Sequence, residues 1–160
     1  MSKPKIDEKG YHFTICGLDN VWLRNGYLLE EEDGESSVTF FGLDNLHKAI
    51  GFAIVKNPPS LRGKQIRFIR HQMEMTQNTL AGILGCDVQS VARYEKEQSY
   101  IPISTDKLIR MLFVEKNKSD QISLSEIMHM NIVTGLMKNT PYVFVKTSSG
   151  WEEYNEIFHK

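Results

Sequence analysis

The sequence predicts a mainly α-helical protein with a small α+β part at its N-terminal end. Apolar residues recur at helical spacing through most of residues 43–138, whereas short alternating runs typical of strands lie mainly before residue 42. Asn57-Pro58-Pro59 marks a linker, because a residue that precedes proline avoids the helical region. We therefore expect three consecutive parts: a small α+β domain over 1–58, a helical domain over 59–116, and a packing or dimerisation segment over 117–160.

The N-terminal part is expected to contain a hairpin and a helix. Between residues 11 and 29 we expect a helix or turn and then a strand, with Asn25-Gly26 as a turn signal. Residues 30–37 are expected to form an acidic loop, and a second strand at 38–41 completes a hairpin across it. Residues 43–55 then show helical spacing of apolar residues.

The middle part contains two short helices around a tight turn. A first helix over 61–72, with Ser60 as its N-cap, carries Ile66, Ile69 and Met73 toward a core. Thr76 is the expected N-cap of a second helix, and Gly85 supplies the positive φ that ends it. Asp87 caps a third helix at about 88–96, which is followed by a further helix that begins at Ser104 or Thr105.

The exposed residues of this unit are of the types that read DNA. Gln89, Ser90 and Arg93 fall on one face of the third helix, where glutamine can pair with adenine edges and arginine with guanine. Gln77, at a helix N-terminus, is placed for a phosphate. The surrounding positive side chains expected at the DNA backbone are Lys64, Arg67, Arg70 and Lys96. An ordinary helical hairpin with a solvated face is the alternative interpretation.

The combined spacing of Thr76-Gln77, Leu80-Ala81, Leu84-Gly85, Val91 and Tyr94-Glu95 resembles the Cro/phage-repressor (XRE) family of bacterial regulators, and Pro102 matches a proline usual in that family. The resemblance implies a five-helix, lambda-repressor-like helix-turn-helix domain over 59–116, with Gln77 on phosphate. Gln89 and Arg93 fall where MqsA-like antitoxins carry a base-reading Asn and Arg. Gln89 departs from that pattern, so no target sequence carries over. Glu97 stands where the family commonly has glycine, which leaves the geometry of that turn open.

Positive charge is concentrated in the same segment. Residues 59–116 hold nine Lys/Arg and six Asp/Glu, a net charge of +3, within a chain whose net charge is −1. A charge of +3 is modest for a DNA-binding domain, so we expect salt-sensitive binding by two copies.

The C-terminal part supplies a candidate dimer interface. Ser123 and Glu126 form a capping-box pattern that begins a helix expected to continue to about residue 138. Its methionines, Met128, Met130 and Met137, fit self-association or packing within the domain. A strand over 142–146 is expected to support a dimer through edge pairing.

Other chemistry has little support. MqsA-like antitoxins carry an N-terminal zinc domain, but His12, Cys16 and His47 do not make the four paired ligands that a structural zinc site needs. We expect no metal, no cofactor and no catalytic residues, with Cys16 as an apolar residue rather than a nucleophile paired with His12. Trp22 and Tyr27 are core aromatics or a surface for a second protein or an effector. The whole chain also resembles bacterial regulators in which a small α/β unit precedes an XRE-type domain.

The expected function is therefore sequence-specific binding of double-stranded DNA. We expect a homodimeric transcriptional repressor that binds a palindromic operator, with no membrane association and a cytoplasmic location, since no apolar run of transmembrane length or signal peptide is present. The alternative is an antitoxin that binds a toxin protein and represses its own operon.

Overall fold

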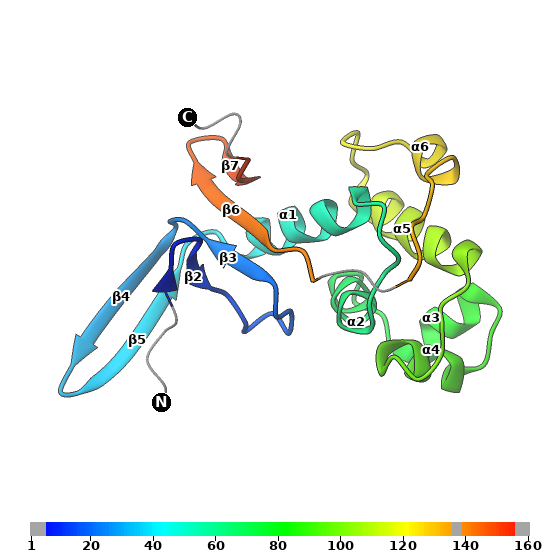
Figure 1. The fold of residues 1–160 in the computed structure, drawn as a ribbon, viewed down its shortest axis with the longest axis horizontal. Helices are drawn as coiled ribbons and strands as arrows, with labels where there is room; N and C mark the ends of the chain where they lie inside the picture. The colour runs from blue at the N-terminus through cyan, green and yellow to red at the C-terminus, as the bar shows by residue number, and fades with distance from the viewer. Residues whose placement is uncertain (1–5, 136–138, 156–160) are drawn as a thin grey trace. The chain divides into compact units, whose positions relative to one another are not determined.

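The computed structural model describes residues 6–135 and 139–155 (Figure 1). Of these residues, 41% lie in helices and 22% in strands. The strands form one five-stranded sheet and one two-stranded sheet. The expectation of a mainly α protein is therefore wrong, and the fold is mixed α/β. The sequence underestimates the strand content, because three strands near the N-terminus have only two or three residues, too few to show an alternation of apolar and polar residues.

The chain divides into two compact units. Unit 1 comprises Met1–Ile50 together with Asn139–Lys160, and unit 2 comprises Gly51–Lys138. The helix α1 (Leu43–Lys56) contributes its first residues to unit 1 and its last residues to unit 2. The expected boundaries after residues 58 and 116 both fall inside unit 2, and the three-part division stays a prediction about independent folding.

The five-stranded sheet of unit 1 is built from both ends of the chain. Its order is β1 (Ile6–Asp7), β2 (Gly10–His12), β3 (Val21–Leu23), β6 (Tyr142–Thr147) and β7 (Gly150–Glu153). Strands β3 and β6 are parallel, with Trp22 opposite Val143, and the other neighbours are antiparallel. The strand at 142–147 is thus interior to the sheet, and the expectation that it supports a dimer as a free edge is wrong.

One face of this sheet carries the core of unit 1. Alternate residues of β2, β3 and β6 are buried with α1 side chains, namely Tyr11, Val21, Leu23, Phe144, Leu46 and Ile50. Gly10, at φ +115°, allows the turn between β1 and β2, and a Cβ there would lie 2.2 Å from the Leu23 carbonyl oxygen. Trp151 closes the core, and its indole N–H donates to the Phe41 carbonyl at 2.9 Å.

A long hairpin forms the separate two-stranded sheet of unit 1. Strands β4 (Tyr27–Glu32) and β5 (Glu35–Phe40) pair antiparallel along their whole length (Figure 1). The predicted hairpin is confirmed, but the predicted acidic loop over 30–37 is wrong, because the four glutamates lie within the strands and only Asp33 lies in the turn. Asp33 and Gly34 both have positive φ, 51° and 81°, as the two-residue turn of type I′ requires. We call residues 27–40 the acidic arm.

Unit 2 is helical. It contains the end of α1, α2 (Gly63–Gln72), α3 (Gln77–Leu84), α4 (Val88–Glu95), α5 (Ile103–Asn117) and α6 (Leu124–Met128). The predicted core positions Ile66, Ile69 and Met73 are buried. Helix α2 begins two residues later than expected, with Arg62 rather than Ser60 as its N-cap residue.

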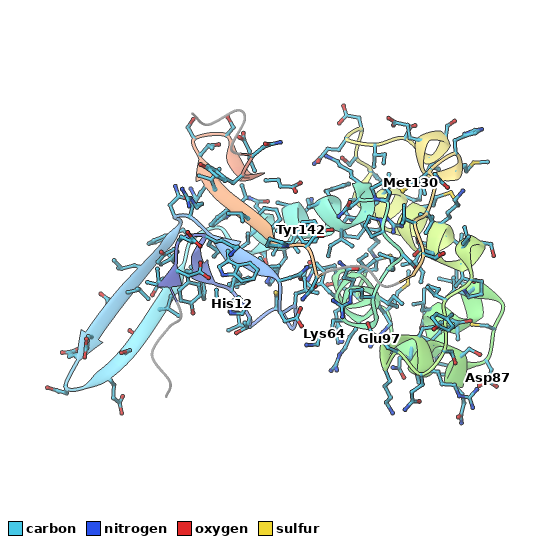
Figure 2. The ribbon with its side chains drawn as sticks, viewed as in Figure 1. His12, Lys64, Asp87, Glu97, Met130 and Tyr142 are labelled. Carbon is cyan, nitrogen blue, oxygen red and sulfur yellow. The ribbon has the colours of Figure 1, made fainter. Side chains whose placement is uncertain are left out.

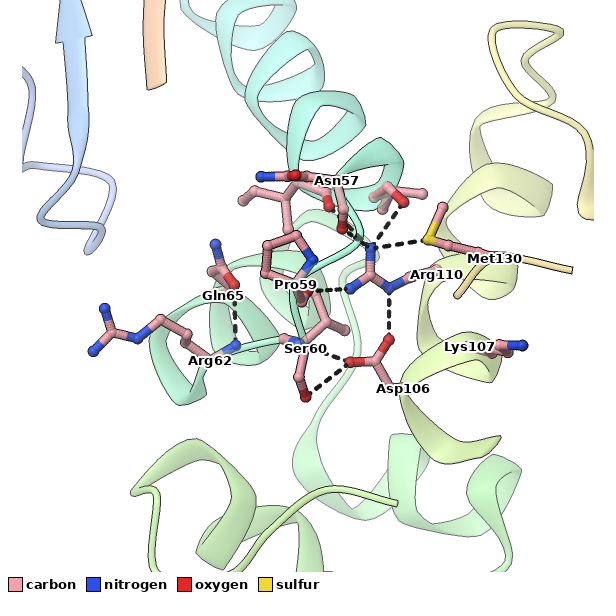
Figure 3. Close-up of polar contacts among 12 residues, drawn as sticks. Asn57, Pro59, Ser60, Arg62, Gln65, Asp106, Lys107, Arg110 and Met130 are labelled. Atoms are coloured by element: carbon pink, nitrogen blue, oxygen red, sulfur yellow. Dashed lines mark hydrogen bonds and ion pairs between the residues drawn. The ribbon is translucent and has the colours of Figure 1, made fainter. Parts of the chain in front are cut away.

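A buried arginine joins three segments of unit 2 (Figure 3). Arg110 on α5 is fully buried, as is its partner Asp106, and Nε of Arg110 lies 2.6 Å from the Asp106 carboxylate. The guanidinium also donates to backbone carbonyls at the end of α1 and in the following linker, those of Ile54, Val55, Asn57 and Pro59, at 2.6–3.2 Å. The last carbonyls of a helix have no partner within it, so Arg110 satisfies that end of α1.

The second oxygen of Asp106 holds the start of the next segment. It accepts a hydrogen bond from the Leu61 backbone N–H at 2.7 Å and a longer one from the Ser60 hydroxyl at 3.5 Å. The linker predicted from Asn57-Pro58-Pro59 is therefore an ordered connection between α1 and α2.

The helix expected to run from residue 123 to 138 ends early. The predicted capping box of Ser123 and Glu126 is confirmed, but α6 stops at Met128. Val133 then lies beside the linker, where its N–H donates to the Pro58 carbonyl and its carbonyl accepts from the Ser60 N–H. Residues 136–138, including Met137, lie outside the described residues. Among the residues described, no helix has the length and apolar character to cross a membrane.

Candidate nucleic-acid interface

The helices α3 and α4 form the two-helix unit that the sequence predicts. Thr76 caps α3, because its hydroxyl accepts from the Thr79 backbone N–H at 3.0 Å. Gly85 ends α3 in the left-handed region at φ 69° and ψ 30°. Asp87 caps α4 by accepting from the Gln89 backbone N–H at 2.7 Å. These three local predictions are confirmed, and together they fix a tight turn between two short helices.

The inner sides of the two helices are apolar. Leu80 and Ala81 on α3 and Val91 on α4 are buried, and α4 packs on α2. Gly63 at the start of α2 permits a close approach, since a Cβ there would lie 2.3 Å from the Glu95 carbonyl oxygen. The start of α2 thus lies against the end of α4, and the side of α4 that carries Gln89 and Arg93 is at the surface.

A buried polar cluster holds α2, α3 and α4 together. Arg70 on α2 pairs with the Glu95 carboxylate at 2.8 Å, and both side chains are under 10% exposed. Arg70 also donates to the Met75 carbonyl at 2.9 Å, and the Gln77 side-chain amide donates to Glu95 at 2.6 Å. Because its guanidinium is occupied and buried, Arg70 positions the helices, and its prediction as a phosphate contact is corrected. Gln77 keeps its place at the start of α3, with its amide oriented by Glu95.

Five of the predicted site residues are exposed: Lys64 and Arg67 on α2, and Gln89, Arg93 and Lys96 on or next to α4. Gln89 and Arg93 lie one helical turn apart on α4, and the described residues offer the Arg93 guanidinium no hydrogen bond or ion pair. Lys64 and Arg67 are three residues apart on α2 and are also exposed. Ser90 is half-buried, and Lys96 is exposed at the residue that ends α4. The structure thus exposes the polar face of α4 that the sequence assigned to bases.

Glu97 links α4 to the start of α2, a role that sequence reasoning missed. Its backbone adopts the left-handed conformation at φ 57°, which glycine adopts more readily than glutamate does. Its carboxylate accepts from the Gly63 backbone N–H at 3.1 Å and lies 3.6 Å from the half-exposed Arg62 guanidinium. Figure 2 labels Glu97 and also Lys64, which follows Gly63 in the chain. The only signal in the sequence is that Glu97 stands where the resembled helix-turn-helix pattern commonly has glycine.

The histidine and cysteine candidates of unit 1 do not come together as a site. The His12 ring stacks on Trp22 at 4.5 Å and its Nε2 lies 2.7 Å from the Asp19 carbonyl oxygen. The Cys16 sulfur lies 3.8 Å from the Phe13 carbonyl oxygen, and burial raises the pKa of its thiol. No group of three His, Cys, Asp or Glu side chains within the described ranges is arranged to hold a metal ion. Trp22 and Tyr27 are half-buried, and the Tyr27 ring packs on Tyr11 at 5.1 Å.

No protein-family model, curated protein or solved structure matches this chain.

Proposed function

We propose that the chain is a sequence-specific DNA-binding protein that represses transcription in the cytoplasm as a homodimer. The observation that carries the proposal is the pair of capped helices α3 and α4 around Gly85, with Gln89 and Arg93 exposed on α4. Helix α4 acts as the recognition helix: it enters the major groove, where glutamine and arginine discriminate between base edges.

The charges of unit 2 support binding to a polyanion. Residues 51–138 hold twelve Lys/Arg and eight Asp/Glu, a net charge of +4. The buried pairs Arg70–Glu95 and Arg110–Asp106 cancel internally, so the whole excess resides on other side chains. Lys64 and Arg67 on α2 then contact phosphates beside α4, and such contacts give binding that weakens as salt rises.

Two copies are needed for a usable affinity, because a charge of +4 supports few phosphate contacts. The face of α6 that holds Leu124 and Met128, 40% and 58% exposed, is the apolar surface we assign to the contact between copies. A two-fold pair reads two half-sites about one helical turn apart, which accounts for a palindromic operator.

The test begins by mapping the chromosomal sites that the full-length chain occupies and titrating the best of them with purified protein. Arg93→Ala should cost about 1–3 kcal/mol at that site and relax sequence preference there. Lys116→Ala, which removes one exposed positive charge near the end of α5, is the matched control and should change affinity far less. Failure of the wild-type chain to prefer any sequence over scrambled DNA would refute the proposal. An equal loss by Arg93→Ala on both DNAs would limit Arg93 to phosphate binding.

A further inference from the structure

We propose that the acidic arm is a docking site for a second, basic protein. The arm is a sheet of two strands only: within the described part of the chain, neither β4 nor β5 pairs with a third strand. A two-stranded sheet is marginally stable alone, and each outer edge offers backbone N–H and C=O groups to an incoming strand. The arm thus has the form of a surface that another polypeptide completes. This inference does not rest on DNA binding.

The arm also presents apolar side chains to solvent. Leu28 and Leu29 near its base are 47% and 37% exposed, although their neighbour Tyr27 packs against Tyr11. In the pairing register Leu28 lies opposite Thr39, and Leu29 opposite Val38. The two leucines are consecutive and lie on opposite faces of the arm, so Leu28 supplies an apolar contact on the same face as Glu30 and Glu32.

The negative charge of the acidic arm indicates that its partner is a cationic protein. The arm holds five carboxylates, those of Glu30, Glu31, Glu32, Asp33 and Glu35, and no Lys or Arg. Unit 1 as a whole has seven Lys/Arg and twelve Asp/Glu, so the arm accounts for all of its net charge of −5. A field of this sign repels nucleic acid, an anionic membrane and the arm of another copy, and it attracts a cationic protein surface.

The placement of these carboxylates within the hairpin is unfavourable for the isolated arm. Glu32 lies directly opposite Glu35, and Glu30 lies two residues along the same strand on the same face. Like charges placed in this way destabilise a sheet. A cationic partner attracts each of these carboxylates and so offsets the repulsion between them. The partner therefore covers the face of Glu30, Glu32 and Glu35, where Leu28 and Thr39 also lie.

The experiment captures the partner and then measures its affinity. A photo-crosslinking amino acid is placed at Thr39 in the full-length chain within its own cells, and the protein captured there is identified and purified. Binding to the wild-type chain is then compared with binding to the triple variant Glu30→Gln, Glu32→Gln, Glu35→Gln. The control, Glu74→Gln, Glu115→Gln, Asp120→Asn, removes the same charge from exposed positions in unit 2.

We expect the captured protein to be strongly basic, to bind less tightly as salt rises, and to lose about tenfold or more in affinity for the arm variant, while the control stays within about twofold. Circular dichroism establishes that each variant is folded. The proposal is overturned if the arm captures no protein or only another copy of the chain. It is also overturned if the captured protein is not basic, or if the arm variant and the control bind it equally.

Discussion

Replacing Arg110 by methionine should destabilise unit 2 severely. Methionine approximates the length of the side chain but donates no hydrogen bond, so the fully buried Asp106 carboxylate loses its 2.6 Å partner. The carbonyls of Val55, Asn57 and Pro59 lose donors at 2.6–3.0 Å as well. Removing one partner of a buried ion pair costs about 3–5 kcal/mol. Asp106 keeps its bond from the Leu61 N–H, so we expect a loss of about 4 kcal/mol, a large share of a typical domain stability.

Urea unfolding followed by circular dichroism measures this loss as a shift of the midpoint. The double variant Arg110→Met, Asp106→Leu removes both charges and should recover part of the stability, because it leaves no unpaired carboxylate in the core. Arg67→Met is the matched control for an exposed arginine and should stay within about 0.5 kcal/mol of the wild type. A loss below about 1 kcal/mol for Arg110→Met, or a double variant less stable than the single one, would refute this account of the buried pair.

Three further predictions concern other parts of the chain. Glu97→Ala should lower the free energy of unfolding by about 1–2 kcal/mol, because the variant loses the hydrogen bond to the Gly63 N–H and keeps the positive φ. Glu97→Gly should be about 1 kcal/mol more stable than the alanine variant, because glycine adopts a positive φ without strain. Equal stabilities of the two variants in urea would contradict this. Met128→Lys should convert the proposed dimer to a monomer in sedimentation, and Asn131→Lys should leave the chain dimeric; a monomeric wild type would reject the α6 interface. Hydrogen bonds from the Ser123 N–H and hydroxyl lower the pKa of Glu126, so its contribution to stability is present above its ordinary pKa and lost as pH falls. The urea midpoints of the wild type and Glu126→Gln should therefore converge between about pH 6 and about pH 3, and a constant gap would contradict the capping role.

Local signals predicted the caps of the two helices that form the candidate site. Thr76, Gly85 and Asp87 each act within four residues of their own position, so their capping roles can be inferred from sequence alone. The burial of Arg70 could not be inferred from the sequence, because it depends on Glu95, a residue twenty-five positions away on a different helix. The positive charge of a residue alone does not separate a phosphate contact from a buried ion pair.

Long-range contacts account for most of the errors in the fold. The strand β6 pairs with β3, about 120 residues earlier, and no local pattern marks it as interior to a sheet. Helical spacing continues beyond Met128, but Val133 instead exchanges hydrogen bonds with Pro58 and Ser60. Tertiary contacts of this kind override local helix propensity at Val133.

The position of β6 and β7 has a consequence for biosynthesis. The five-stranded sheet takes three strands from residues 6–23 and two from residues beyond 141, so it cannot close until residues 142–153 have been translated. The helical unit is by then fully synthesised, and its contacts are more local, which favours its folding first. During that interval the edge of β3 is exposed on the ribosome without its parallel neighbour. A ribosome that stalls before residue 142 would hold a folded helical unit beside an incomplete sheet, the species of this chain most open to aggregation and proteolysis.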